Sequence, residues 1–170
     1  MIMENFWRDA QKLPNIITLT RLLFGAPATI ILYKNGFEYT WLVFVLFAAL
    51  DWLDGKIARK TNTVTSLGMR LDPLADQFLV LPVTWYLVYV SVLHATFPLI
   101  LTLREIIMIF MRAVASRNIP AILSGKLKIN AWYISIACVL FGGQLYFFGF
   151  IFLALAVVFS LWSFGKYCGL

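Results

Sequence analysis

Carboxylates at helical spacing, in residues 51–76, are the feature of this sequence that most clearly suits chemistry. The segment reads DWLDGKIARKTNTVTSLGMRLDPLAD and holds four of the eight acidic residues in the chain. On a helix, Asp51, Asp54, Gly55 and Ala58 stand at offsets 0, 3, 4 and 7 and therefore share one face. That face carries two carboxylates and no bulky side chain.

Asp72 and Asp76 form a second pair one helical turn apart, and Gly68 lies one turn before them. If the two faces met, four carboxylates would surround one point and would repel each other strongly without bound cations. Oxygen ligands without histidine or cysteine favour Mg²⁺ or Mn²⁺ over zinc. The pattern therefore predicts metal-assisted phosphoryl transfer, in preference to a set of solvated surface charges.

Composition indicates an integral membrane protein with a single domain over residues 1–170. The chain is 62% hydrophobic and only 13% charged, whereas soluble domains average about 25% charged residues. The formal net charge of +6 does not predict nucleic-acid binding, because the basic residues cluster between apolar runs.

We predict an all-α fold: a bundle of six transmembrane helices preceded by an interfacial amphipathic helix. Residues 1–13 have an apolar stripe opposite basic residues, which suits a helix in the interface plane. Pro14 is expected to end that helix and Asn15 to cap the next. Asp72 is either an N-cap before Pro73, or the third span starts earlier and bends there. The expected spans are 15–33, 38–60, 71–92, 96–117, 126–144 and 147–165, each near the roughly 20 residues that a bilayer requires.

Lysine and arginine residues concentrate at both termini and in the second and fourth connections between spans. The positive-inside rule therefore predicts that both termini and the active site face the cytoplasm, most simply across a bacterial inner membrane. Asp51 follows ten uncharged residues, about 15 Å of helix, or half of the hydrocarbon layer, so we expect it to begin a pocket in the cytoplasmic half of the membrane. A carboxylate at that depth is costly unless cations compensate it.

The segment resembles the motif D-x2-D-G-x2-A-R-x8-G-x3-D-x3-D of the CDP-alcohol phosphatidyltransferases. The resemblance implies six transmembrane helices, homodimers, a CDP-linked lipid donor, and two divalent ions held by the four aspartates. It also implies that the last aspartate is the general base, and that the small residues and the arginine approach the nucleotide. A second element, N-x2-T-x2-R, is similar to a family feature near the nucleotide, although capping and interfacial anchoring explain it equally well. The motif residues are Asp51, Asp54, Gly55, Ala58, Arg59, Gly68, Asp72 and Asp76, and those of the second element are Asn15, Thr18 and Arg21.

Basic residues in and after the fourth span predict an anionic acceptor. Arg104 and Arg112 are eight residues apart and able to converge on one helix, while Lys126 and Lys128 open the fifth span. Lipid headgroup contact explains part of this charge equally well. LREI at 103–106 and GKLK at 125–128 resemble the phosphatidylglycerophosphate synthases, which implies CDP-diacylglycerol as donor and glycerol 3-phosphate as acceptor.

Alternatives remain at the level of sequence. Ile129 and Trp132 stand where that branch usually shows threonine and glutamine, so a cardiolipin-synthase-like enzyme using phosphatidylglycerol, or an inositol-phosphate user, stays open. A divalent-cation transporter is a remote alternative, because intramembrane carboxylates also mark ion pathways. A transporter does not account for the small residues of the motif or for the surrounding cations.

Overall fold

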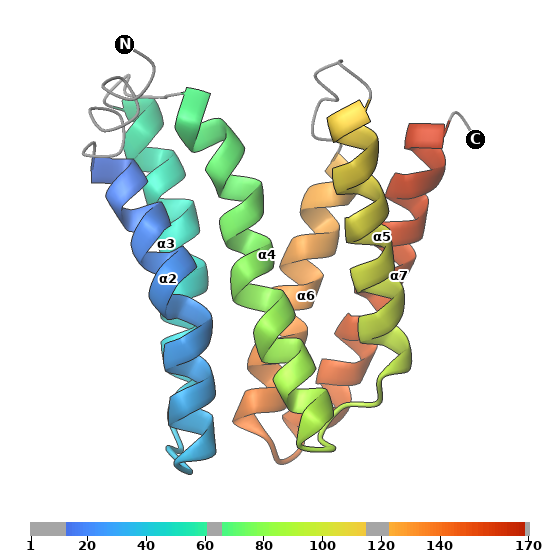
Figure 1. The fold of residues 1–170 in the computed structure, drawn as a ribbon. Helices are drawn as coiled ribbons and strands as arrows, with labels where there is room; N and C mark the ends of the chain where they lie inside the picture. Colours follow the sequence, from blue (N-terminus) through green and yellow to red (C-terminus); the bar gives the residue numbers. More distant parts are fainter. Residues whose placement is uncertain (1–12, 61–65, 115–122, 169–170) are drawn as a thin grey trace. The chain divides into compact units, whose positions relative to one another are not determined.

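The protein is all-helical throughout the part of the chain that the structure describes. This computed structural model describes the backbone of residues 13–60, 66–114 and 123–168, and the side-chain surroundings of residues 16–50, 75–111 and 127–165. The predicted interfacial helix over residues 1–13 lies outside the described residues except for its last residue. The helices are α2 (Leu13–Lys34), α3 (Thr40–Lys60), α4 (Ser66–Tyr89), α5 (Thr96–Val114), α6 (Leu123–Phe141) and α7 (Leu145–Cys168) (Figure 1).

Each predicted span corresponds to one helix, but two local predictions about helix starts are wrong. Asn15 does not cap α2, because the helix already begins at Leu13 and includes Pro14 in its first turn, where a missing N–H costs nothing. Asp72 is not an N-cap either, since α4 begins at Ser66 and continues through Pro73. The alternative of an earlier start is therefore the correct one.

Two described helices are long and apolar enough to cross a membrane, Ile16–Lys34 and Leu145–Gly165. The apolar parts of two more, Thr40–Leu50 and Leu127–Phe141, are shorter. Many large apolar side chains on these helices are exposed, among them Phe24, which is the pattern expected where lipid or another chain covers the surface.

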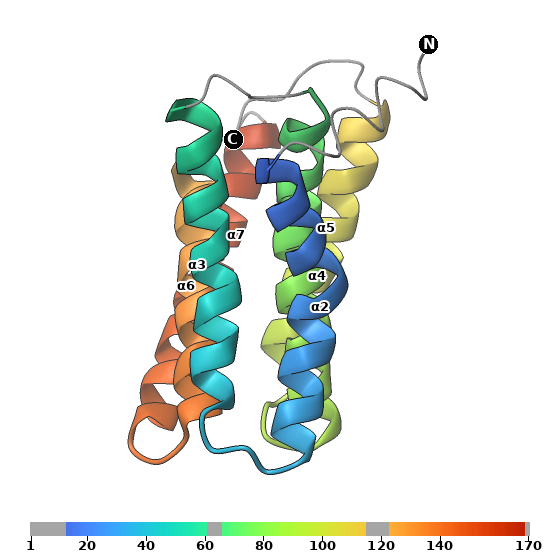
Figure 2. The same ribbon diagram turned by 90° about the vertical axis from the view of Figure 1, so that its left-hand side faces the viewer.

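The contacts divide the chain into two compact units, Met1–Val83 and Thr84–Leu170. In the first unit α2 packs along α3, and Figure 2 shows the short connection that joins them. Gly36 makes that connection: its φ of 70° suits glycine, and the Gly36 and Phe37 amides bond back to carbonyls of the last turn of α2. The chain thus reverses direction, which is the geometry needed for two antiparallel neighbours.

In the second unit α6 packs along α7, and α5 also contacts α7. Gly149 permits the close approach of α6 and α7, because a Cβ at that position would stand 2.6 Å from Val139 Cγ2. The Ser135 hydroxyl donates to the Gly149 carbonyl at 2.8 Å across the same contact. Buried Trp132 donates from Nε1 to Thr84 Oγ1 at 3.1 Å. These contacts hold α6 in a defined position within the unit that carries the cationic side chains described below.

Candidate active site

The aspartate motif lies on two helices, as its spacing predicts. Residues 51–59 belong to α3 and residues 68–76 belong to α4. The helical backbone confirms that each aspartate pair and its neighbouring small residues share one helix face. Most of the predicted site side chains nevertheless lie outside the described residues, namely those of Asn15, Asp51, Asp54, Gly55, Ala58, Arg59, Gly68, Asp72, Arg112 and Lys126.

Asp76 is the motif aspartate whose side chain is described, and it faces a buried cation. Arg21 of α2 places Nη2 3.2 Å from Asp76 Oδ1, and the Arg21 side chain is 0% exposed while that of Asp76 is 20% exposed. The pair is a charge–charge contact without the alignment of a hydrogen bond. A buried positive charge at this distance restricts the orientation of the carboxylate.

Thr18 lies one turn before Arg21 on α2 and is also buried. The T-x2-R part of the predicted second element therefore occupies one face of α2, and its arginine contacts the aspartate motif of the same unit. The sequence predicted that Arg21 belongs to an element near the nucleotide, but it did not predict the contact with Asp76.

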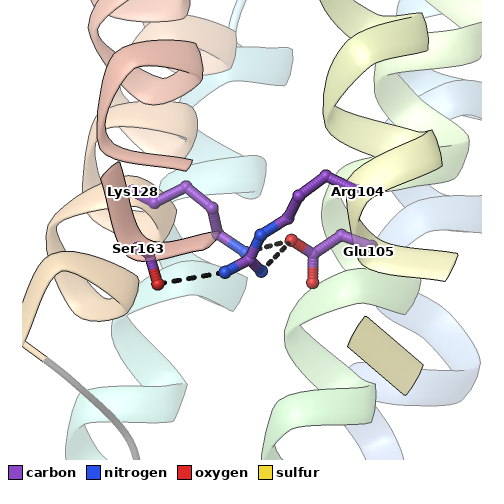
Figure 3. A network of polar contacts seen from close by, with 4 residues as sticks. All are labelled: Arg104, Glu105, Lys128 and Ser163. Atoms are coloured by element: carbon purple, nitrogen blue, oxygen red, sulfur yellow. Dashed lines mark hydrogen bonds and ion pairs between the residues drawn. The ribbon is translucent and has the colours of Figure 1, made fainter. Parts of the chain in front are cut away.

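A buried polar network in the second unit gathers four side chains from three helices (Figure 3). Arg104 and Glu105 come from α5, Lys128 from α6 and Ser163 from α7. Glu105 Oε1 accepts from Arg104 Nη1 at 2.8 Å and from Lys128 Nζ at 2.5 Å. Arg104 Nη2 donates to Ser163 Oγ at 3.0 Å. The network thus brings together the two described members of the predicted acceptor site, Arg104 and Lys128.

The network carries an excess positive charge. Two cations and one carboxylate sum to +1, and all three side chains are at least nine-tenths buried. Arg104 Nε is also buried and has no hydrogen-bond partner among the described residues. A buried donor without a hydrogen-bond partner costs free energy, and two cations lie close together here, so the arrangement favours an anion with acceptor oxygens.

Glu105 and Ser163 are the members of this network that sequence reasoning missed as site residues. Glu105 was visible as the only acid near Arg104. Ser163 gave a weaker signal, because it is one of two serines in the otherwise strongly apolar α7. No grouping of three or more potential metal-ligating side chains occurs within the described residues. Among the four predicted ligands, Asp76 is the only one whose side chain is described.

Comparison with known proteins identifies the class. A sequence model of the CDP-alcohol phosphatidyltransferase family matches residues 11–162, which include the aspartate motif and the three charged members of the buried network, Arg104, Glu105 and Lys128. The chain belongs to the CDP-alcohol phosphatidyltransferase family. It is therefore an enzyme of the transferase class, from a membrane-embedded family that generally depends on divalent metal ions.

Individual relatives within the family carry more specific enzyme names. The chain is similar to the CDP-diacylglycerol–glycerol-3-phosphate 3-phosphatidyltransferase of Wigglesworthia glossinidia brevipalpis, at 33% identity over 137 residues and 74% of each chain. It is 31% identical to the enzyme of the same name from Bacillus subtilis over 148 residues, 76% of each chain. It is also 32% identical over 113 residues to a CMP-forming cardiolipin synthase of Streptomyces coelicolor, covering 62% of this chain and 52% of that protein.

Proposed function

We propose that this protein transfers the phosphatidyl group of CDP-diacylglycerol to glycerol 3-phosphate, giving phosphatidylglycerol phosphate and CMP. The observation that carries the choice of acceptor is the buried Arg104–Glu105–Lys128 cluster, in which two cations contact one carboxylate and Arg104 Nε has no hydrogen-bond partner among the described residues. A phosphate monoester supplies negative charge and several acceptor oxygens to such a cluster. The relatives named for this activity support the same acceptor.

We assign the binding of the lipid donor, CDP-diacylglycerol, to the first unit. The motif places two aspartates on α3 and two on α4 at one-turn spacing, and an all-carboxylate donor set fits Mg²⁺ or Mn²⁺. Asp51, Asp54, Asp72 and Asp76 would hold two such ions, which when bound would neutralise charge on the diphosphate and on departing CMP. The small residues Gly55, Ala58 and Gly68, with Arg59, Asn15 and Thr18, would contact the nucleotide.

Asp76 has an additional role in the proposed reaction. The acceptor hydroxyl oxygen attacks the phosphorus that bears the diacylglycerol, and the bond from that phosphorus to the CMP oxygen breaks. Asp76 accepts the hydroxyl proton as general base. Arg21 orients the Asp76 carboxylate through the 3.2 Å ion pair. Arg104 and Lys128, with Arg112 and Lys126, bind the acceptor phosphate.

We further propose a six-span membrane protein with both termini in the cytoplasm, an interfacial N-terminal helix, a single catalytic domain and a homodimeric assembly. The six described helices and their exposed apolar side chains support the membrane assignment. The lysine and arginine distribution supports the orientation.

The test is an acceptor panel with purified full-length protein, labelled CDP-diacylglycerol and Mg²⁺. Glycerol 3-phosphate is expected to drive CMP release, whereas serine, inositol phosphate and phosphatidylglycerol are not. The cardiolipin-synthase relative makes phosphatidylglycerol the main competitor, and turnover with it alone would replace the proposed acceptor. Asp76→Asn is expected to abolish transfer; full activity in that variant would remove Asp76 from the base role.

A further inference from the structure

Ser163 is a buried polar side chain in a helix that is otherwise almost wholly apolar. It lies near the end of α7 and is 0% exposed. Its hydroxyl oxygen accepts a hydrogen bond from Arg104 Nη2 at 3.0 Å, across 59 residues of sequence. A serine hydroxyl in a helix can donate to a backbone carbonyl one turn earlier and still accept a second bond, and here the accepted bond links α7 to Arg104 of α5.

The bond to Ser163 completes the restraint on the Arg104 guanidinium. Nη1 is held by Glu105 on the same helix, and Nη2 is held by Ser163 on α7 (Figure 3). Because the guanidinium is planar, two acceptors on its two terminal nitrogens fix the orientation of the whole group. Glu105 Oε1 also receives Lys128 Nζ, so the positions of both cations depend on the same small network.

We propose that Ser163 is a positioning residue for the acceptor phosphate and that it acts through Arg104. This inference rests on the proposed function, in which Arg104 and Lys128 bind the phosphate of glycerol 3-phosphate. Without the hydroxyl, the guanidinium keeps its charge but loses one of its two fixed points. A phosphate then meets an arginine that must be ordered during binding, which weakens the acceptor interaction specifically.

Ser160 provides a matched control on the same helix. It lies three residues before Ser163 and is equally buried, and its hydroxyl has no hydrogen-bond partner among the described residues. Replacing either serine with alanine removes one buried hydroxyl from α7 and leaves every charge in place. The two variants therefore differ in whether the bond to Arg104 is lost.

The experiment compares Ser163→Ala, Ser163→Cys and Ser160→Ala with wild type, as full-length enzyme in detergent micelles. KM for glycerol 3-phosphate, KM for CDP-diacylglycerol and kcat are measured, together with inhibition by inorganic phosphate as a competitor of the acceptor. Ser163→Ala is expected to raise KM for glycerol 3-phosphate about tenfold, the effect of one hydrogen bond to a charged group. The inhibition constant for phosphate should rise in parallel, while KM for CDP-diacylglycerol stays within about twofold of wild type. Ser163→Cys keeps the shape of the side chain with a larger sulfur atom that is a weaker acceptor, and its constants should change in the same direction.

Three outcomes overturn the inference. If both Ser163 variants match Ser160→Ala in every constant, the hydroxyl does not position Arg104 for the acceptor. If both KM values and the unfolding temperature change together, Ser163 is a structural link between helices only. If KM for glycerol 3-phosphate rises while phosphate inhibition is unchanged, the hydroxyl acts on the glycerol part. Failure of wild type to use glycerol 3-phosphate would instead refute the proposed function itself, and that result is visible before any variant is compared.

Discussion

Replacing Glu105 with glutamine tests the charge balance of the buried network. The substitution keeps the side-chain shape and removes the one carboxylate that faces both Arg104 and Lys128. At the observed 2.8 and 2.5 Å, each pair has a gross attraction of about 6 kcal/mol with an effective dielectric constant near 20. Desolvation of the three ions offsets most of that attraction. Because removing one partner leaves two cations buried together, the expected loss in free energy of unfolding is about 3–5 kcal/mol.

The assay is thermal unfolding of the purified protein in detergent. A loss of that size corresponds to a fall of about 6–20 °C in Tm for a chain of this length. Glu38→Gln is the control, because Glu38 is an exposed carboxylate in the α2–α3 connection, and its removal is expected to change stability by less than about 0.5 kcal/mol.

The change in Tm on addition of inorganic phosphate provides a second measurement on the Glu105→Gln variant. With Glu105 removed, the network has a charge of +2 instead of +1, so phosphate should raise Tm more in the variant than in wild type. Equal Tm values for Glu105→Gln and Glu38→Gln, or a phosphate response no larger than that of wild type, would refute the reasoning about the buried charge.

Three further substitutions test separate contacts. Gly149→Ala is expected to lower the free energy of unfolding by about 1–3 kcal/mol, measured by thermal unfolding, because the added methyl would stand 2.6 Å from a valine of α6; an unchanged Tm would contradict this packing. Arg21→Gln removes the cation 3.2 Å from Asp76 and should reduce kcat about 100-fold in steady-state assays with little change in KM for glycerol 3-phosphate, since the carboxylate loses its fixed orientation; a selective KM effect would argue against this role. Trp132→Phe removes the indole N–H that donates to Thr84 Oγ1 at 3.1 Å and should cost about 0.5–1.5 kcal/mol in the same unfolding assay, whereas a stability equal to wild type would show that the bond contributes nothing.

The helical fold was predictable because apolar runs of suitable length are separated by polar and basic connections. Each expected span corresponds to one helix of the structure. The start of α4 was not predictable from the sequence, because Pro73 is consistent both with a helix start and with an interior position. The structure begins α4 at Ser66, so Asp72 and Asp76 lie on a helix that already includes Gly68. The helical spacing of the motif is therefore not interrupted by Pro73.

The candidate site was predictable in its residue types but not in its pairing. Arg104 and Lys128 were identified from charge, yet their link through Glu105 depends on how α5 and α6 pack. Neighbours in a helix point about 100° apart, so sequence adjacency does not predict that Arg104 and Glu105 bond to each other. Ser163 is 59 residues from Arg104, and nothing in its local sequence indicates the partner. Arg21 likewise finds Asp76 only through the packing of the first unit.

The most direct test of the proposed function is the stoichiometry of product formation by purified wild-type protein supplied with CDP-diacylglycerol and Mg²⁺. CMP and phosphatidylglycerol phosphate are expected to form in equal amounts, and only when glycerol 3-phosphate is present. CMP release that is independent of glycerol 3-phosphate, or a product formed from phosphatidylglycerol in its place, would contradict the proposed function.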